Sequence, residues 1–224
     1  MTPGTQRLPA PPQGLTLGRV VDVDDPQGRG RVQVRLASID LAVWASVATA
    51  SAGRGYGIQM LPRADEVVVV AFLSPEQPIV LGSIWTGDSP VPEKLDRIGD
   101  RYGAVTPQGM ALVLDDGDGP RMRVTTPAGH QLTLTDGDGG KLSIELSTTS
   151  IEVTPTEITL SAAANVTIEA AGQIELRGAT IKMSAGSVSI DSGIVNCSGV
   201  VQSNSCIATS VVGSTYTPGA GNVW

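Results

Sequence analysis

The C-terminal half of the chain carries a short apolar repeat that strongly limits how it can fold. Two apolar residues stand at positions i and i+2, and successive pairs begin seven or eight residues apart. The pairs are Ile144/Leu146, Ile151/Val153, Ile158/Leu160, Val166/Ile168, Ile174/Leu176, Ile181/Met183 and Val188/Ile190. Alternation with a period of two indicates short strands with one buried face. The regular spacing of these strands predicts a stacked β-helix.

A repeat this short predicts a shaft that is built from three chains. Seven residues provide about three strand residues and a corner, which is too little to close a coil within one chain. We therefore expect a homotrimer in which each chain adds one strand per layer, with the paired apolar side chains as the trimer core. No aromatic residue occurs between Tyr102 and Tyr216. A narrow interior that excludes rings explains this absence.

The N-terminal region has a different pattern, in which short β-prone runs alternate with Gly, Pro and Asp-rich turns. The expected strands are Leu17–Val23, Arg31–Leu36, Val43–Ala48, Tyr56–Leu61, Val67–Phe72 and Ile79–Ile84. No stretch sustains a period of 3.6 residues, so helix should be scarce. Strands of this number and length suit a small closed barrel of the OB type, because closure removes exposed edges.

The chain is therefore predicted to be all-β, with an N-terminal OB-fold barrel and a C-terminal intertwined triple-stranded β-helix. Between these parts, the sequence predicts three wider strands, at Met110–Asp115, Arg121–Thr125 and His130–Thr135. The predicted division is an N-terminal arm (1–14), the barrel (15–88), connector strands (89–141), the shaft (142–210) and a tip or cap (211–224).

Charge and composition exclude several classes of function. The formal net charge is −7, from 15 basic and 22 acidic residues, so the chain lacks the cationic surface that nucleic-acid binding needs. No apolar run is long enough to span a bilayer, and no signal peptide is visible, which predicts production in the cytoplasm. Cys197 and Cys206 are interpreted as buried structural thiols; a threefold thiolate cluster is the alternative for Cys206.

Two Asp-Gly clusters, Asp115–Gly119 and Asp136–Gly140, suggest either calcium loops or tight turns. An EF-hand starting at Asp136 needs a carboxylate where Ser147 stands, so turns are favoured. The single histidine, His130, has no visible nucleophile or carboxylate arrangement around it and is interpreted as structural.

Three glutamates of the repeats, Glu145, Glu152 and Glu175, could act as the carboxylates of a polysaccharide-cleaving β-helix. Their regular placement is better explained as a solvated face that blocks aggregation. We therefore expect no enzyme activity, no catalytic or metal-binding residues, and no cofactor.

Several segments of the sequence resemble a known family. They are LGRVVDV (17–23), GRVQV (30–34), LPRADEVVVVAF (61–72), PIVLGSIW (78–85) and GHQLTLTD (129–136). Together with the repeats, they resemble the phage baseplate assembly protein V family and its relatives, the valine-glycine repeat spikes of type VI secretion. The resemblance covers roughly residues 15 to 200. A lysozyme insertion has no room between residues 88 and 104, and the His-x-His iron motif of some relatives is absent.

The resemblance implies a central baseplate spike of a contractile phage tail, a trimeric needle that punctures the bacterial envelope mechanically. A separate hub protein is expected at the barrel end, because only a short arm precedes the barrel. The C-terminal segment is expected either to cap the last strand layer or to bind a PAAR-like tip protein, and a frayed tail is the plainer alternative. The tip residues named for this role are Tyr216, Pro218, Asn222, Val223 and Trp224.

Two other functions remain open at this point. A spike of a type VI or phage-derived secretion device is hard to separate from a virion spike by sequence. A carbohydrate-acting β-solenoid, either a lyase or a lectin, is less consistent with the seven- or eight-residue repeat.

Overall fold

The computed structural model describes residues 14–97 and 99–214, and nearly all regular structure within them is β. The helical elements in these ranges are two short 3₁₀ turns, η1 (Glu93–Leu95) and η2 (Gly137–Gly139). Across the same ranges, no helix has the length and apolar character needed to cross a membrane. The all-β prediction is confirmed.

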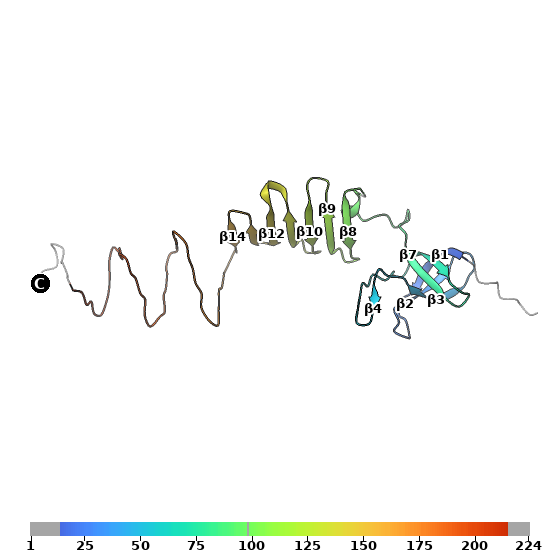
Figure 1. Ribbon diagram of the computed structural model, residues 1–224, viewed down its shortest axis with the longest axis horizontal. Helices are drawn as coiled ribbons and strands as arrows, with labels where there is room; N and C mark the ends of the chain where they lie inside the picture. Colours follow the sequence, from blue (N-terminus) through green and yellow to red (C-terminus); the bar gives the residue numbers. More distant parts are fainter. Residues whose placement is uncertain (1–13, 98, 215–224) are drawn as a thin grey trace, which may run out of the picture. The chain divides into compact units, whose positions relative to one another are not determined.

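An N-terminal barrel closes in the strand order β1-β2-β3-β7-β6 (Figure 1). Its strands are β1 (Gly14–Asp22), β2 (Arg31–Leu36), β3 (Ala42–Val47), β6 (Val67–Phe72) and β7 (Pro78–Ser83). All neighbours pair antiparallel except β3 and β7, which pair parallel. The expected OB-type barrel is therefore present, and each strand lies within a few residues of its predicted position.

The barrel interior is filled almost entirely by valine. The largest side chains with no exposed surface are Val20, Val32, Val34, Val68, Val70 and Val80. They occupy alternate positions of β1, β2, β6 and β7, as the period of two requires. Gly18 lets β1 approach β2 closely, because a Cβ there would lie 2.3 Å from Cγ1 of Val34. The barrel therefore has a complete core made by a single chain.

The predicted strand Tyr56–Leu61 is wrong. The structure has a small hairpin of β4 (Ala52–Gly53) and β5 (Tyr56–Gly57) instead, and residues 58–61 lie outside any strand. Gly55 has a φ of +83°, a value that favours glycine and turns the chain back on itself. The segment therefore pairs with its own upstream residues, and Met60 is left exposed.

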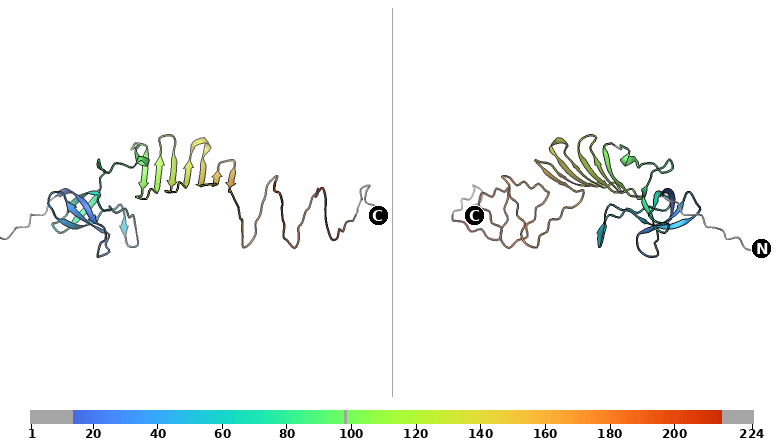
Figure 2. Two further views of the ribbon diagram at one scale, coloured as in Figure 1. Left: turned by 180° about the vertical axis from the view of Figure 1, so that it is seen from behind. Right: turned by 45° about the vertical axis from the view of Figure 1, so that its right-hand side comes forward.

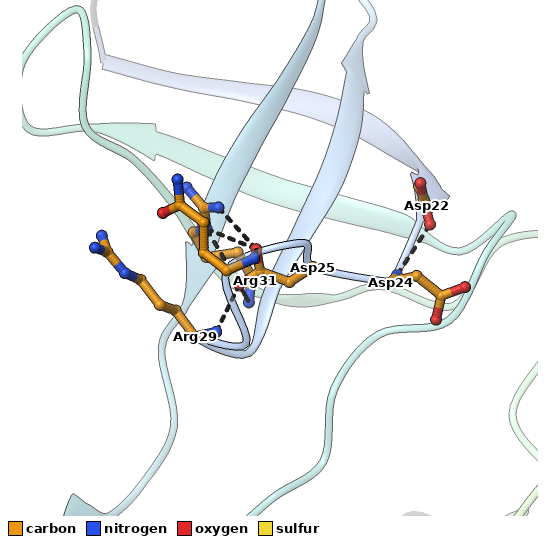
Figure 3. A network of polar contacts seen from close by, with 6 residues as sticks. Asp22, Asp24, Asp25, Arg29 and Arg31 are labelled. Carbon is orange, nitrogen blue, oxygen red and sulfur yellow. Dashed lines mark hydrogen bonds and ion pairs between the residues drawn. The ribbon is translucent and has the colours of Figure 1, made fainter.

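The loop between β1 and β2 is organised around one carboxylate (Figure 3). Asp25 accepts hydrogen bonds from Nη2 of Arg31 at 2.7 Å and from the backbone N–H groups of Gln27 at 3.0 Å and Arg29 at 2.7 Å. The Arg31 guanidinium, together with these N–H groups, holds the pKa of Asp25 far below the usual carboxylate range. The same guanidinium lies 5.6 Å from the ring centroid of Trp44, which ties the loop to β3.

A seven-stranded antiparallel sheet follows, in the order β14 to β8 (Figure 2). Its strands are β8 (Arg101–Val105), β9 (Ala111–Asp115), β10 (Arg121–Thr125), β11 (Gln131–Thr135), β12 (Lys141–Leu146), β13 (Thr149–Val153) and β14 (Ile158–Ser161). The three predicted connector strands are confirmed as β9, β10 and β11.

The first three repeats differ from expectation, because their strands pair within one chain. A two-residue turn joins β12 to β13: Leu146 pairs with Thr149, and Ser147 has a φ of +54°. A short turn of this kind closes a hairpin locally, so the idea that repeat strands pair only between chains is wrong for residues 144–160. The sheet also continues without a break across the predicted boundary at 141/142.

Beyond β14 the chain has no strand or helix in residues 162–214, the last part that the structure describes (Figure 1). The chain divides into two units between Thr167 and Ile168. Within the described ranges, residues 162–214 make no backbone–backbone hydrogen bond. This segment therefore contains the later repeats but none of the backbone pairing that would stabilise them within one chain.

Candidate functional site

One face of the seven-stranded sheet is apolar along its whole width. The register of all six strand pairs aligns the apolar positions of successive strands into two rows that cross the sheet. One row is Ala104, Leu112, Val124, Leu132, Ile144, Ile151 and Leu160; the other is Tyr102, Leu114, Met122, Leu134, Leu142, Val153 and Ile158. We call this surface the apolar face.

No segment among residues 14–97 and 99–214 covers the apolar face. Leu134 is 46% exposed and Ile158 is 75% exposed, and several other members of the two rows are similarly open. Soluble monomers rarely expose a contiguous apolar surface this large. The face therefore has the properties of an assembly surface.

The opposite face of the sheet is mostly polar, and ion pairs cross between its strands. Arg101 Nε lies 2.9 Å from Asp115 Oδ2, and Lys141 Nζ lies 2.7 Å from Glu152 Oε2. Ser143 is buried between neighbouring strands. One polar and one apolar face is the pattern of an antiparallel sheet with solvent on one side and a packed partner on the other.

The apolar repeat continues into residues 162–214 without a change of character. Val166, Ile174 and Val188 are about half exposed, and Leu176 is 70% exposed. Buried backbone groups must form hydrogen bonds, so this segment cannot be buried by its own chain alone. Pairing with other chains would satisfy the backbone and cover the side chains at once.

The predicted core residues divide between these two regions. Ile144, Ile151, Val153, Ile158 and Leu160 lie in the two rows of the apolar face, and Leu146 lies beyond them on the same side of β12, opposite Thr149. The remaining ones lie in the unpaired segment, namely Val166, Ile168, Ile174, Leu176, Ile181, Met183, Val188 and Ile190. The five tip residues, Tyr216, Pro218, Asn222, Val223 and Trp224, lie outside the described residues.

Sequence reasoning missed the upstream half of the apolar face. The pairs Leu112/Leu114, Met122/Val124, Leu132/Leu134 and Leu142/Ile144 begin at residues 112, 122, 132 and 142. They follow the same i, i+2 rule, but their wider spacing leaves room for five-residue strands and turns. A search for the rule with a variable period would have found them.

The Asp-Gly cluster at the end of β9, Asp115–Gly119, forms a turn. The carboxylate of its first residue already accepts hydrogen bonds from the protein. Asp115 is 8% exposed, and its Oδ1 accepts a hydrogen bond from the Gly117 N–H at 3.1 Å. This N–H, together with the Arg101 guanidinium, keeps the pKa of Asp115 below its ordinary value. In the part of the chain that the structure describes, no three His, Cys, Asp or Glu side chains gather into a metal-binding group.

His130 lies just before β11, and its backbone N–H donates to Thr126 Oγ1 at 3.2 Å. Its Nδ1 is buried without a hydrogen-bond partner among the described residues. Cys197 and Cys206, which were expected to be buried thiols, are exposed in the single chain. Their burial therefore depends on covering by other chains and stays a prediction.

Comparison with known families identifies both parts of the chain. Residues 16–85 match a family model described as the type VI secretion system/phage-baseplate injector OB domain. Residues 121–196 match one described as the phage baseplate V C-terminal trimerisation domain. No curated protein matches the chain. The first match corresponds to the barrel, and the second spans β10 to β14 and most of the unpaired segment.

Proposed function

Because the chain belongs to the phage baseplate assembly protein V family, we propose that three copies form the central spike of a contractile tail. In this proposal the spike pierces the bacterial envelope by mechanical force. The observation that carries it is the apolar face, which leads directly into a repeat segment that has no backbone pairing of its own. Such a surface needs partner chains, and the match to a trimerisation domain over residues 121–196 covers most of it.

The trimer core is proposed to run from the apolar face through the repeats to Ile190. In the trimer, three apolar faces would cover one another, and each chain would add strands beside its neighbours. The Val, Ile, Leu and Met side chains of the repeats would fill a narrow interior, while Glu145 and Glu175 remain outside. Strand ladders that run between chains resist shear along their whole length, because many hydrogen bonds must break together.

The spike is proposed to receive force at its barrel end. The outer surface of the barrel carries Leu15, which is 69% exposed, and Leu17, which is 46% exposed and lies two residues further along β1. These side chains support a contact with a baseplate hub protein, because exposed apolar clusters mark interaction surfaces. A PAAR-like tip protein is the proposed partner at the other end, through Tyr216, Trp224 and their neighbours.

A type VI or phage-derived secretion spike is the second candidate, because the description of the matching OB model covers both machines. The C-terminal match is described for phage baseplate V alone, and this favours a tail baseplate. Production in the host cytoplasm and a purely structural, non-enzymatic role are part of the proposal.

Sedimentation of the purified full chain tests the assembly. We expect a mass of about 69 kDa, three times 23.0 kDa, that does not change on dilution into the low micromolar range. Negative-stain electron microscopy should then show a needle with a collar. A monomer at all concentrations, or a globular particle, would contradict the proposal.

A further inference from the structure

A small cavity lies on the polar face of the sheet, away from the apolar face. It has a volume of about 280 Å³ and lies where the η1 segment meets β8 to β11. Four cationic side chains line it: Lys94 of η1, Arg101 of β8, and Arg121 and Arg123 of β10. Because Arg121 and Arg123 are two residues apart on one strand, their side chains leave the same face of the sheet.

The cavity concentrates positive charge in a protein that is otherwise acidic. Four of the 15 Lys and Arg residues line it, although the formal net charge of the chain is −7. Asp115 is the only carboxylate among the described residues that line it. Like charges that share a cavity repel one another, so a cation here that lacks a carboxylate partner does not stabilise the sheet.

The carboxylate accounts for only part of this charge. Asp115 Oδ2 lies 2.9 Å from Arg101 Nε and 4.0 Å from Arg121 Nη2. Arg101 Nη1 also pairs with Asp96 Oδ1 at 2.9 Å. Asp96 and Asp115 together can therefore balance Arg101 and Arg121 but no further cation.

Two cations remain without a carboxylate partner. In the described part of the chain, neither Lys94 nor Arg123 has an ion pair. Lys94 Nζ donates to the neutral backbone carbonyl of Gly109 at 3.0 Å, which leaves two of its three donors unused. Both side chains are exposed enough to meet a ligand from solvent.

We propose that this cavity binds a phosphate-type oxyanion between Lys94 and Arg123. The planar guanidinium of Arg123 suits two parallel hydrogen bonds to a tetrahedral anion, and Lys94 adds a mobile point charge. The volume is close to the lower limit of small-molecule sites, so it fits one phosphate group or the head of a phosphorylated glycolipid. This inference rests on the proposed function only in placing the polar face outside the trimer, where the target envelope could reach it.

The test measures anion binding by the full chain with isothermal titration calorimetry. The probes are inorganic phosphate, a glutamate-rich peptide, and vesicles of phosphatidylcholine with or without phosphatidic acid. The variant is the double substitution Lys94→Gln with Arg123→Gln, which leaves Asp115 and its arginines intact. The matched control is Arg54→Gln with Arg29→Gln, which removes the same charge from exposed loops of the barrel.

We expect saturable phosphate binding by the wild type. The affinity should fall about tenfold or more in the double variant, because at least one charge-assisted hydrogen bond is lost. The control should bind like wild type. Binding to phosphatidic acid vesicles without binding to free phosphate would show that the phosphate group is recognised as part of a lipid. No saturable phosphate or phosphatidic acid binding, equal binding by both variants, or tighter binding of the acidic peptide would overturn the proposal. Sedimentation of the same samples reports trimer assembly separately. A loss of anion binding in an intact trimer is thereby distinguished from a failure of the proposed assembly.

Discussion

The barrel and the C-terminal repeats use the same residue types and the same period of two, yet they reach opposite states in a single chain. In the barrel, Val34 and Val70 have no exposed surface and every strand has two hydrogen-bonded neighbours. In the repeats, Leu176 and Ile190 stay mostly exposed, and residues 162–214 lack backbone pairing within the described ranges. The difference is which chain supplies the neighbouring strand. The barrel strands find it in their own chain, whereas the repeats beyond residue 161 have no paired strand among the described residues.

The seven-stranded sheet lies between these extremes. Its backbone is paired within one chain, as in the barrel, but its apolar face is open, as in the repeats. Dependence on partner chains therefore increases along the sequence, first for side-chain burial and then also for hydrogen bonding. Substitutions in the three regions should separate these two kinds of dependence.

The largest effect is expected from a charge in the unpaired repeats. Ile168→Asp would place three carboxylates around the axis of the trimer, and each unpaired buried charge costs several kcal/mol. We expect the trimer to be lost in sedimentation, while hydrogen exchange of the barrel amides stays slow. Thr167→Asp is the matched control, since this neighbour is expected to face solvent and should leave the trimer intact. Equal assembly of both variants would show that Ile168 does not face the axis.

A smaller effect is expected from a charge on the sheet. Leu134→Asp should weaken the trimer by roughly 3 kcal/mol per chain or more, because a buried leucine is lost and a charge must be solvated. The sheet itself should persist, since its hydrogen bonds lie within one chain. The readout is dissociation on dilution in sedimentation.

The control for this substitution is Thr133→Asp, one residue away on the polar face. It should assemble like wild type. If both variants dissociate equally, the sheet stands outside the interface and the trimer is held by the repeats alone.

Much of this fold could be predicted because its elements are local patterns. The barrel strands follow from β-branched runs between turn residues, and the β9 to β11 meander follows from Gly-rich turns. The hairpin at Ser147 could not be predicted, because a two-residue Ser-Thr turn has no strong signal, unlike Asn-Gly or Asp-Gly.

Prediction of the site was limited in another way. The alternation in 144–160 identified one face of the sheet, because period two reports a face directly. That this face and the repeats up to Ile190 form the trimer core stays a prediction. The cationic cavity was not visible in the sequence, since Lys94, Arg101 and Arg123 lie in three separate segments that only the meander brings together. Contacts across strands depend on register, and register is a property of the folded sheet.

The smallest effect is expected within the barrel, where acid should act without dissociating the trimer. The pKa of Asp25 is lower in the folded chain than in the unfolded chain, so its carboxylate stabilises the barrel above the ordinary carboxylate pKa of about 3.9. That contribution is lost as the pH falls below this value toward the folded pKa.

Asp25→Asn should therefore be less stable than wild type near pH 6, and this gap in the free energy of unfolding should narrow toward pH 2. The measurement is urea unfolding followed by tryptophan fluorescence, to which Trp44, beside Arg31, contributes together with Trp85 and Trp224. Asp40→Asn is the control, because its pair with Arg35 is exposed and spans 3.7 Å, and exposed pairs contribute little. A gap that stays constant with pH would mean that Asp25 supports the loop by shape rather than by charge. A trimer that dissociates as the loop loosens would show that the stability of the barrel is coupled to assembly, unlike a barrel whose core is complete within one chain.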